Sequence, residues 1–368
     1  MNDLPFVSVM IPMRNEVGSI AACLDSVLAQ DYPSDCFEVL VVDGASSDGS
    51  DALIERYAQR DRRVRLLRNP RRIVPTALNI AIRAAAGDII MRVDGHTHIA
   101  PDYLRIGVET LQRTGADNVG GPMVAVGGGG SVGEAIALAT SSRFGIGSYF
   151  HYGRSEAEVD TVYLGMYPRR IFERIGLFDE EMVRNQDDEF NYRLRKAGGR
   201  IVLTPAMRSW YQNRRSLTAL AKQYAQYGLW KVRVLQKHPA QMSVRHFVPP
   251  ALVHGLVLPL LLVPWMPAVA LLSLAQAGIY VVAVSAVSAG IAGRHGWRLF
   301  APLVATFAAL HLSWGAGFAV GMGRFALRWL TSESAPPGLA TPAPPAGDET
   351  SQPTSEHLAS ARGARSEA

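Results

Sequence analysis

Cysteine and charged residues are both scarce in this chain of 368 residues. Its two cysteines, Cys23 and Cys36, are too few for a disulfide framework or a cysteine-ligated zinc site, which fits a reducing compartment. Charged residues make up 19% of the chain and hydrophobic residues 48%, so a disordered protein is excluded and a wholly soluble one is disfavoured. Part of the chain is therefore expected to contact lipid.

Two long stretches contain no Asp, Glu, Lys or Arg. They cover 47 positions, residues 247–293, and 25 positions, residues 299–323. Because a helix needs about 20 apolar residues to cross a bilayer, the first stretch predicts two spans and the second predicts one. We expect a membrane domain of about three transmembrane helices over residues 247–330, with a tight turn from Pro264 to Pro267. So few spans favour an anchor over a conduit.

The rest of the chain lacks the features of a secreted or nucleic-acid-binding protein. Asp3 stands where a secretory signal needs positive charge and Pro12 interrupts the apolar run, so residues 1–240 are expected to form a cytoplasmic domain at the inner membrane. Residues 331–368 carry a net charge of −3, which leaves +8 for the body. A positive body suits phosphate-bearing ligands or an anionic membrane surface. No nucleic-acid recognition module is found.

Two segments near the membrane region have distinct patterns. Residues 216–237 predict an amphipathic helix, with basic side chains away from its apolar side. It either lies in the lipid headgroup region or packs on the globular domain. Residues 331–368 are rich in Ala, Pro, Ser and Thr without apolar periodicity, so they predict a disordered tail.

Residues 5 to about 210 alternate short β-branched runs with helical patterns, which is typical of an α/β domain with a mainly parallel sheet. A representative helix is Ser19 to Gln30. The strand candidates are Val7 to Ile11, Glu38 to Val42, Val64 to Leu67, Ile89 to Val93 and Ile201 to Leu203. Ligands of such sheets bind at the carboxyl ends of the strands, so the polar residues that follow each strand are site candidates.

Polar residues follow the first two strands. Pro12 ends the first strand, and Arg14 and Glu16 follow it, where they can meet a base, ribose or phosphate. Asp43 ends the second strand and can accept from a base N–H or a ribose hydroxyl. Either segment alone is equally typical of an ordinary loop. The G-x-G-x-x-G fingerprint is missing after both strands, which argues against a dinucleotide-dependent enzyme.

The fourth strand ends in a possible metal site. Asp94 and His96 can reach one cation at the sheet edge, and Mg²⁺ or Mn²⁺ favours such carboxylate ligands, with imidazole better suited to Mn²⁺. Arg68, Arg71 and Arg72 lie on a connecting loop where they can bind a diphosphate, although a solvated face is the ordinary reading of that basic stretch.

Three consecutive acidic residues, Asp187, Asp188 and Glu189, begin a predicted helix. Favourable interaction with the helix dipole alone can explain such a cluster. Their mutual repulsion would also raise the pKa of at least one carboxyl group, as a general base requires.

In order, the segments I-P-M-R-N-E, V-D-G-A-S-S-D-G, A-L-N-I-A-I, V-D-G-H and Q-D-D-E-F-N-Y-R-L resemble family 2 glycosyltransferases with the GT-A fold. The resemblance covers about residues 5–230, and its order and spacing are more specific than any one motif. V-D-T-V-Y-L-G at 159–165 and Q-Y-A-Q-Y-G at 223–228, followed by C-terminal spans, are similar to the ExoA-like glycosyltransferases of succinoglycan assembly.

The resemblance implies roles for the residues that match. Pro12, Arg14, Glu16 and Asp43 would hold the uridine end of a nucleotide sugar such as UDP-glucose, with Arg72 on its phosphates. Asp94 would contact ribose or a divalent cation, and His96 stands where the family has a second carboxylate. The catalytic base would be Asp187, although Gln186 replaces the family's first Glu, and Asp188 or Glu189 is the fallback. Gly165, Asp188, Gln212 and Arg215 would face the acceptor or the diphosphate.

The expected activity is inverting transfer of a sugar to a lipid-linked saccharide. We expect one sugar to be transferred, not a polymer to be made, because Ser216 replaces the Trp of the Q-x-x-R-W motif that holds a growing polymer in the family. The expected partners are the nucleotide sugar, the acceptor and membrane lipid, with a polysaccharide-assembly complex as a candidate. Two alternatives stay open: transfer of a sugar directly to a polyprenyl phosphate, and a catalytically silent nucleotide-sugar-binding membrane protein.

Overall fold

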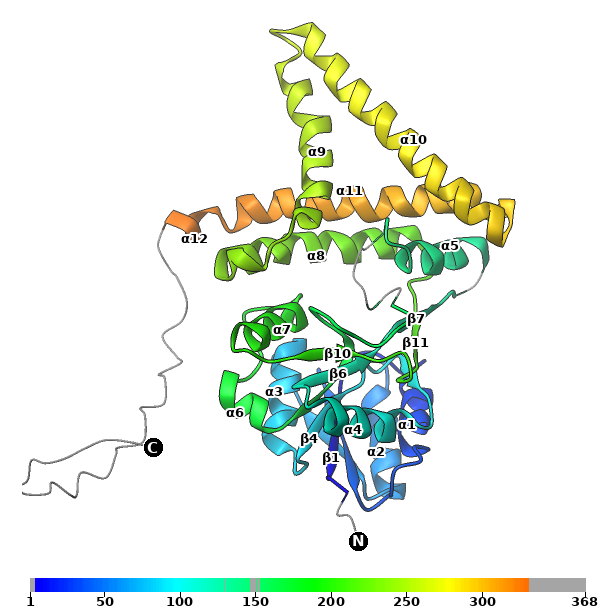
Figure 1. Cartoon of the computed structure of the whole chain (residues 1–368), viewed down its shortest axis with the longest axis vertical. Helices are drawn as coiled ribbons and strands as arrows, with labels where there is room; N and C mark the ends of the chain where they lie inside the picture. The colour runs from blue at the N-terminus through cyan, green and yellow to red at the C-terminus, as the bar shows by residue number, and fades with distance from the viewer. Residues whose placement is uncertain (1–3, 129, 146–149, 151–152, 331–368) are drawn as a thin grey trace, which may run out of the picture. The chain divides into compact units, whose positions relative to one another are not determined.

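The computed structural model describes residues 4–128, 130–145, 150 and 153–330, and the predicted disordered tail lies outside these ranges. The described residues form an α/β part followed by long apolar helices (Figure 1).

The α/β part is built on a mixed sheet of eight strands in the order β3-β2-β1-β4-β9-β6-β10-β8. The first four are parallel, β9 is antiparallel to both of its neighbours, and β10 is parallel to β6. All five predicted strands are present. The sheet comprises β1 (Val7–Met13), β2 (Phe37–Asp43), β3 (Val64–Arg68), β4 (Ile89–Arg92), β6 (Asn118–Gly121), β8 (Ala157–Glu158), β9 (Tyr163–Pro168) and β10 (Ile201–Leu203).

Helices cover both faces of this sheet, so its central strands are buried throughout. Every residue of β2 is buried, which explains its continuous apolar run. Val9 and Val41 pack in one cluster with α1, whereas Met10 and Leu40 pack on the opposite face with α3. The helices of the α/β part are α1 (Ile20–Leu28), α2 (Ser50–Arg60), α3 (Val74–Ala84), α4 (Tyr103–Thr114), α5 (Gly130–Thr140), α6 (Arg170–Ile175) and α7 (Gln186–Lys196).

A second sheet of three short strands, in the order β5-β11-β7, lies beside the first. Its strands are β5 (Thr97–Ile99), β7 (Met123–Val126) and β11 (Ser209–Gln212). It comes close to the large sheet at Gly121, where a Cβ atom would lie 1.6 Å from the carbonyl oxygen of Met207. Only glycine permits this approach of two backbones.

The predicted amphipathic helix is α8 (Leu217–Lys237), and the Ser216 side chain accepts from the backbone N–H of Ala219 to begin it. Its polar side packs on the α/β part. Lys231 contacts Asp188, Arg233 donates to Glu181, and Lys237, in the last turn, contacts Asp179.

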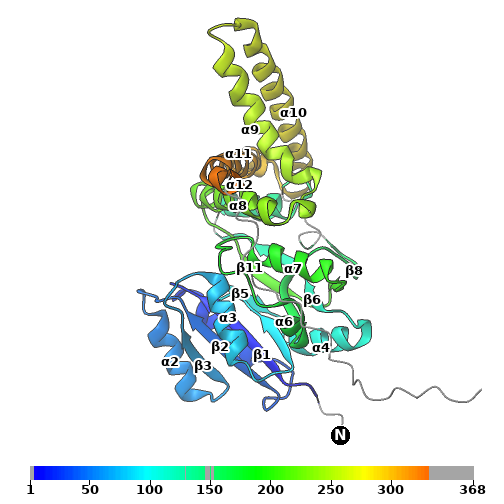
Figure 2. The ribbon, with the colours of Figure 1, turned by 90° about the vertical axis from the view of Figure 1, so that its left-hand side faces the viewer.

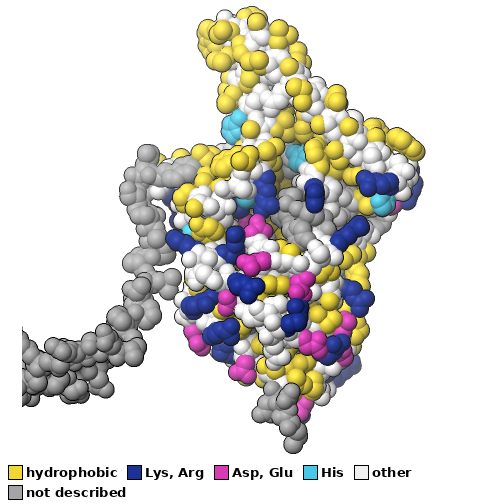
Figure 3. All heavy atoms as spheres, in the orientation of Figure 1, with side chains coloured by type: hydrophobic (Ala, Val, Ile, Leu, Met, Phe, Trp, Pro, Cys, Tyr) yellow, Lys and Arg dark blue, Asp and Glu magenta, His cyan; other side chains and the backbone are white. Residues whose placement is uncertain are grey.

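Three helices after α8 are long and apolar enough to cross a membrane by length and composition: Val244–Leu262, Pro267–His295 and Trp297–Arg324. Their helical cores are α9 (Val244–Leu262), α10 (Ala270–His295) and α11 (Phe300–Arg324), and the short α12 (Ala326–Leu330) follows. The predicted turn at Pro264 to Pro267 joins α9 to α10. Hydrophobic side chains gather over α9 and α10, whereas charged side chains cover the α/β part (Figure 3).

Candidate active site

A cavity of about 1420 Å³ lies at the carboxyl ends of β1 and β4, beside the N-terminus of α7. It is where an open parallel sheet is expected to bind its ligand. Eight basic and four acidic residues line it, so it favours an anionic ligand. The charged residues are Arg14, Glu16, Arg72, Arg92, Asp94, Arg143, Arg184, Asp187, Asp188, Arg214, Lys231 and Arg245.

Most of the residues predicted for the site line this one cavity. Pro12, Arg14, Glu16, Arg72, Asp94, His96, Asp187 and Asp188 are all among its lining residues. Backbone strain is concentrated here as well: of five non-glycine residues with positive φ in the described part, Asn15, Arg72 and Asn185 line the cavity. Such conformations are costly and tend to persist where function requires them.

Asp43 does not reach the cavity. Its side chain is fully buried, and its carboxylate accepts from the N–H and hydroxyl of Ser46 and from Arg68. The turn after β2 folds Ser46 back over the carboxylate, and only the following residue, Gly44, lines the cavity. In this structure the carboxylate of Asp43 holds the turn, and its contact with the donor stays a prediction.

Gly165, Gln212 and Arg215 also lie outside the lining of the cavity. Gly165 is buried within β9, next to the Tyr167 hydroxyl. At the end of β11 the cavity is lined instead by Tyr211, Asn213 and Arg214.

Arg92 is the central charged residue of the site, and the sequence analysis did not identify it. Its Nε donates to Asp94 at 2.8 Å, and its Nη1 donates to Asp187. Arg92 and Asp94 have side chains only 13% and 16% exposed, whereas Asp187 is 42% exposed to the cavity. One guanidinium group therefore fixes two carboxylates that lie 93 residues apart in the chain.

The three acidic residues of α7 have different environments. Burial, together with Asp94 and Asp188 nearby, raises the pKa of Asp187, while Arg92 opposes the rise. Although burial opposes it, contact with Lys231 holds the pKa of Asp188 below its ordinary value. Glu189 is 2% exposed and bonds to Arg193 and His238, so it has a structural role. Asp187 is the carboxylate best suited to accept a proton.

Asp94 and His96 fit a divalent cation that is also held by substrate oxygens. Among the described residues no three His, Cys, Asp or Glu side chains gather as a complete metal site. Mg²⁺ and Mn²⁺ commonly take one or two protein ligands and complete their coordination with phosphate oxygens. The His96 Nδ1 lies 3.0 Å from Glu16 Oε1, which orients the ring and leaves Nε2 for a ligand.

The far end of the cavity is formed by the apolar helices. Its lining there includes Pro249 and Leu252 from α9, Ile279 and Tyr280 from α10, and Trp314 from α11. The polar residues at the edge of the sheet and the apolar residues of the three helices thus line one continuous cavity. A ligand with a charged head and an apolar tail suits these two ends.

The sheet, the polar cavity at its carboxyl edge and the acidic start of α7 define a GT-A glycosyltransferase. Two solved structures share the fold, with only 22% and 18% identity. A mannosyltransferase from Pyrobaculum calidifontis, solved with GDP-Man and Mn²⁺, aligns with a TM-score of 0.53 over 87% of this chain and 88% of its own. Residues 1–349 of S. aureus TarS, solved with UDP-GlcNAc, align with a TM-score of 0.52 over 86% of this chain and 92% of that fragment.

Similarity in sequence identifies the family of the chain. The profile of glycosyl transferase family 2 matches residues 8–176. The succinoglycan biosynthesis protein ExoA of Rhizobium meliloti is 32% identical over 84% of this chain and 93% of its own length. A dolichyl N-acetyl-α-D-glucosaminyl phosphate 3-β-D-2,3-diacetamido-2,3-dideoxy-β-D-glucuronosyltransferase of Methanococcus voltae is 30% identical over 63% of this chain and 74% of its own. The chain belongs to glycosyl transferase family 2 and is a glycosyltransferase.

Proposed function

We propose that this enzyme transfers one sugar, with inversion, from a nucleotide diphosphate sugar such as UDP-glucose to a lipid-linked saccharide. The reaction takes place at the cytoplasmic face of the inner membrane, in the synthesis of an exopolysaccharide or another cell-surface glycan. The supporting observation is the cavity, which is lined both by the polar residues around Asp187 and by apolar residues of α9, α10 and α11.

The donor lies at the sheet end of the cavity. Arg14 and Glu16 follow β1, and both line the cavity together with Arg72. We assign the first two to the nucleoside and Arg72 to the diphosphate. The preponderance of basic residues in the lining offsets the charge of the donor. The solved structures of similar fold contain UDP-GlcNAc or GDP-Man, so nucleotide sugars of either base suit this architecture.

Asp187 is the proposed general base. It removes the proton from the acceptor hydroxyl as that oxygen attacks the anomeric carbon. The bond between this carbon and the diphosphate oxygen breaks, and the nucleoside diphosphate leaves with the electron pair. A single displacement inverts the anomeric configuration, so an α-linked donor gives a β-glycoside. Arg92 holds Asp187 in place and stabilises its carboxylate.

A divalent cation bound by Asp94 and His96 would supply positive charge to the departing diphosphate. Both side chains line the donor end of the cavity. The Mn²⁺ of the mannosyltransferase structure is consistent with this role.

The acceptor enters from the membrane end. A lipid-linked saccharide carries an apolar chain, a phosphate or diphosphate, and a sugar hydroxyl, in that order. The cavity lining offers a match for each of these parts: apolar residues of α9, α10 and α11, the basic Arg245 and Lys231, and Asp187. The names of two relatives support such an acceptor, because one refers to succinoglycan biosynthesis and the other to a dolichyl phosphate-linked sugar.

The proposal is tested with purified enzyme in detergent, a panel of nucleotide sugars, and Mn²⁺ or Mg²⁺. Release of nucleoside diphosphate is followed with and without a membrane lipid extract. We expect one donor to be turned over and the extract to stimulate its turnover. Asp187→Asn should reduce turnover about a hundredfold or more, as expected on loss of a general base. Glu109→Gln, an exposed change on α4, is the matched control and should have no effect.

Two outcomes point to the alternatives. Turnover that Asp187→Asn leaves unchanged contradicts the assigned base and favours a silent binding protein. A radiolabelled lipid product that mild acid cleaves to the free monosaccharide identifies a polyprenyl phosphate as the acceptor.

A further inference from the structure

The third apolar helix, α11, has both of its ends attached to the α/β part. We infer that α11 lies in the plane of the membrane surface and that only the α9–α10 hairpin enters the bilayer. This differs from the three spans that hydropathy predicts, because length and composition do not separate a spanning helix from one lying on the membrane surface.

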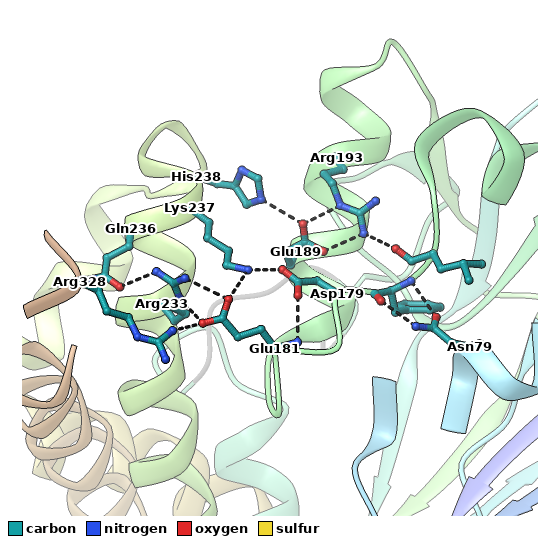
Figure 4. A network of polar contacts seen from close by, with 12 residues as sticks. Asn79, Asp179, Glu181, Glu189, Arg193, Arg233, Gln236, Lys237, His238 and Arg328 are labelled. Atoms are coloured by element: carbon teal, nitrogen blue, oxygen red, sulfur yellow. Dashed lines mark hydrogen bonds and ion pairs between the residues drawn. The ribbon is translucent and has the colours of Figure 1, made fainter. Parts of the chain in front are cut away.

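The N-terminal end of α11 is held by an ion pair. Arg298, two residues before the helix, donates to Glu134 of α5 at 2.7 Å. The C-terminal end is held in the same way, because Arg328 contacts Glu181 in the loop before α7 (Figure 4). Gln236 of α8 also donates to the carbonyl oxygen of Phe325 at 2.9 Å.

These tethers place both ends of α11 on one side of the membrane. A helix of 25 residues is about 37 Å long, enough to cross the hydrocarbon core. If it crossed, its two ends would lie on opposite sides of the bilayer. Here both ends contact carboxylates of the same polar domain.

Close packing along its length holds α11 against α8. A Cβ atom on Gly317 would lie 2.0 Å from the carbonyl oxygen of Ala225, and one on Gly228 would lie 2.0 Å from that of Trp314. Such small residues allow two helix backbones to approach closely. Figures 1 and 2 agree that the two helices run side by side, while α9 and α10 cross them.

The helix α8 cannot itself lie within hydrocarbon. Lys231 and Arg233 point from α8 to Asp188 and Glu181 of the α/β part and are almost fully buried there. Since α11 packs along α8, it runs parallel to the face of the α/β part that α8 covers (Figure 1). The midpoint of α11 is bound to the α/β part too, because His311 Nε2 lies 2.9 Å from the carbonyl oxygen of Phe144.

The α9–α10 hairpin has the properties of the inserted element. Its exposed apolar side chains include Leu261, Leu272 and Ile279, each at least 60% exposed. Basic residues flank its base, at Arg245 in the first turn of α9 and Arg294 at the end of α10, and residues 263–269 at its tip carry no charge. This distribution keeps positive charge on the side of the catalytic domain.

Cysteine labelling in sealed membrane vesicles tests the placement of α11. Single cysteines are introduced in a Cys36→Ser background, because Cys23 is buried. Ser34→Cys reports the side of the catalytic domain, and Ser351→Cys reports the side of the chain beyond α11. With a membrane-impermeant maleimide we expect both to react in vesicles of the same orientation. Reaction in vesicles of opposite orientation would show that α11 crosses and would overturn the inference.

A cross-linking measurement tests the tethers directly. The full-length protein in native membranes carries Glu134→Cys with Arg298→Cys, or Glu181→Cys with Arg328→Cys, and a short bismaleimide is added. Mass spectrometry should identify an intramolecular cross-link at each end of α11. A link at one end only would contradict the in-plane placement.

Discussion

Replacement of Arg92 by glutamine removes the one group that fixes both Asp94 and Asp187. In the wild type its Nε serves Asp94 and its Nη1 serves Asp187. Glutamine keeps a polar side chain but lacks the charge and the reach of the guanidinium group. The base should therefore be less well positioned, and its carboxylate less well stabilised.

The size of the expected loss of turnover follows from how exposed the two contacts of Arg92 are. A hydrogen bond to a charged group contributes about 1.5–3 kcal/mol, and the pair with Asp94 is mostly shielded from water. The pair with Asp187 is partly exposed to the cavity, so we discount it to at most about 1 kcal/mol. Together these contacts are worth about 3 kcal/mol, which corresponds to roughly a hundredfold in turnover if they act on the transition state.

The assay is nucleoside diphosphate release across a range of pH. Arg92 lowers the pKa of Asp187, so Arg92→Gln should move the acid limb of turnover to higher pH. Arg92→Lys keeps the charge but has one nitrogen for two carboxylates, so turnover should fall while the acid limb stays near that of the wild type. Arg105→Gln, which removes an exposed pair with Asp31, is the matched control.

The reasoning is refuted by one result in particular. If Arg92→Gln turns over within about threefold of the wild type and its acid limb is unmoved, Arg92 does not position the base.

Three further predictions concern the wild type, the cation and the helix packing. Burial raises the pKa of Asp187, so lowering the pH should reduce wild-type turnover already at a pH above the pKa of an ordinary aspartate. If turnover falls only near that ordinary pKa, the prediction is contradicted. Chelation should lower turnover and Mn²⁺ should restore it better than Mg²⁺, with His96→Asp reversing the preference, because imidazole suits Mn²⁺. Gly228→Leu should lower the Tm of the detergent-solubilised protein by several degrees, since α8 and α11 must separate; Gly278→Leu, with open space around it, should not.

The elements with a strong periodic or continuous pattern were predictable. The strands β1 and β2 have continuous apolar sequences because both faces of the sheet are covered there. The helix α8 begins one residue after the predicted start at Ser216 and ends at the predicted Lys237. Strands such as β9 were not predicted. Gly165 and Pro168 are unfavourable in strands, and β9 is a strand because it pairs with β4 and β6.

The site was predictable where residues follow strands and was not where distant segments meet. Arg92 is the last residue of a strand and shows nothing in sequence of its partner in α7. Lys231 has the spacing of a solvent-facing residue, yet it is 4% exposed and contacts Asp188. Asp43 shows the reverse case: its position at a strand end predicts ligand contact, but the local turn takes up its oxygens.

The contact between Lys231 and Asp188 has a mechanical consequence. Asp188 is the chain neighbour of the proposed catalytic base, and Lys231 belongs to the helix that supports α11. A change in the surrounding lipid that shifts α8 would act on Asp188 through this contact, and so on the position of Asp187. Turnover should therefore respond to the thickness of the host bilayer at temperatures where the α/β part stays fully folded, so the lipid tunes the chemistry from outside the pocket.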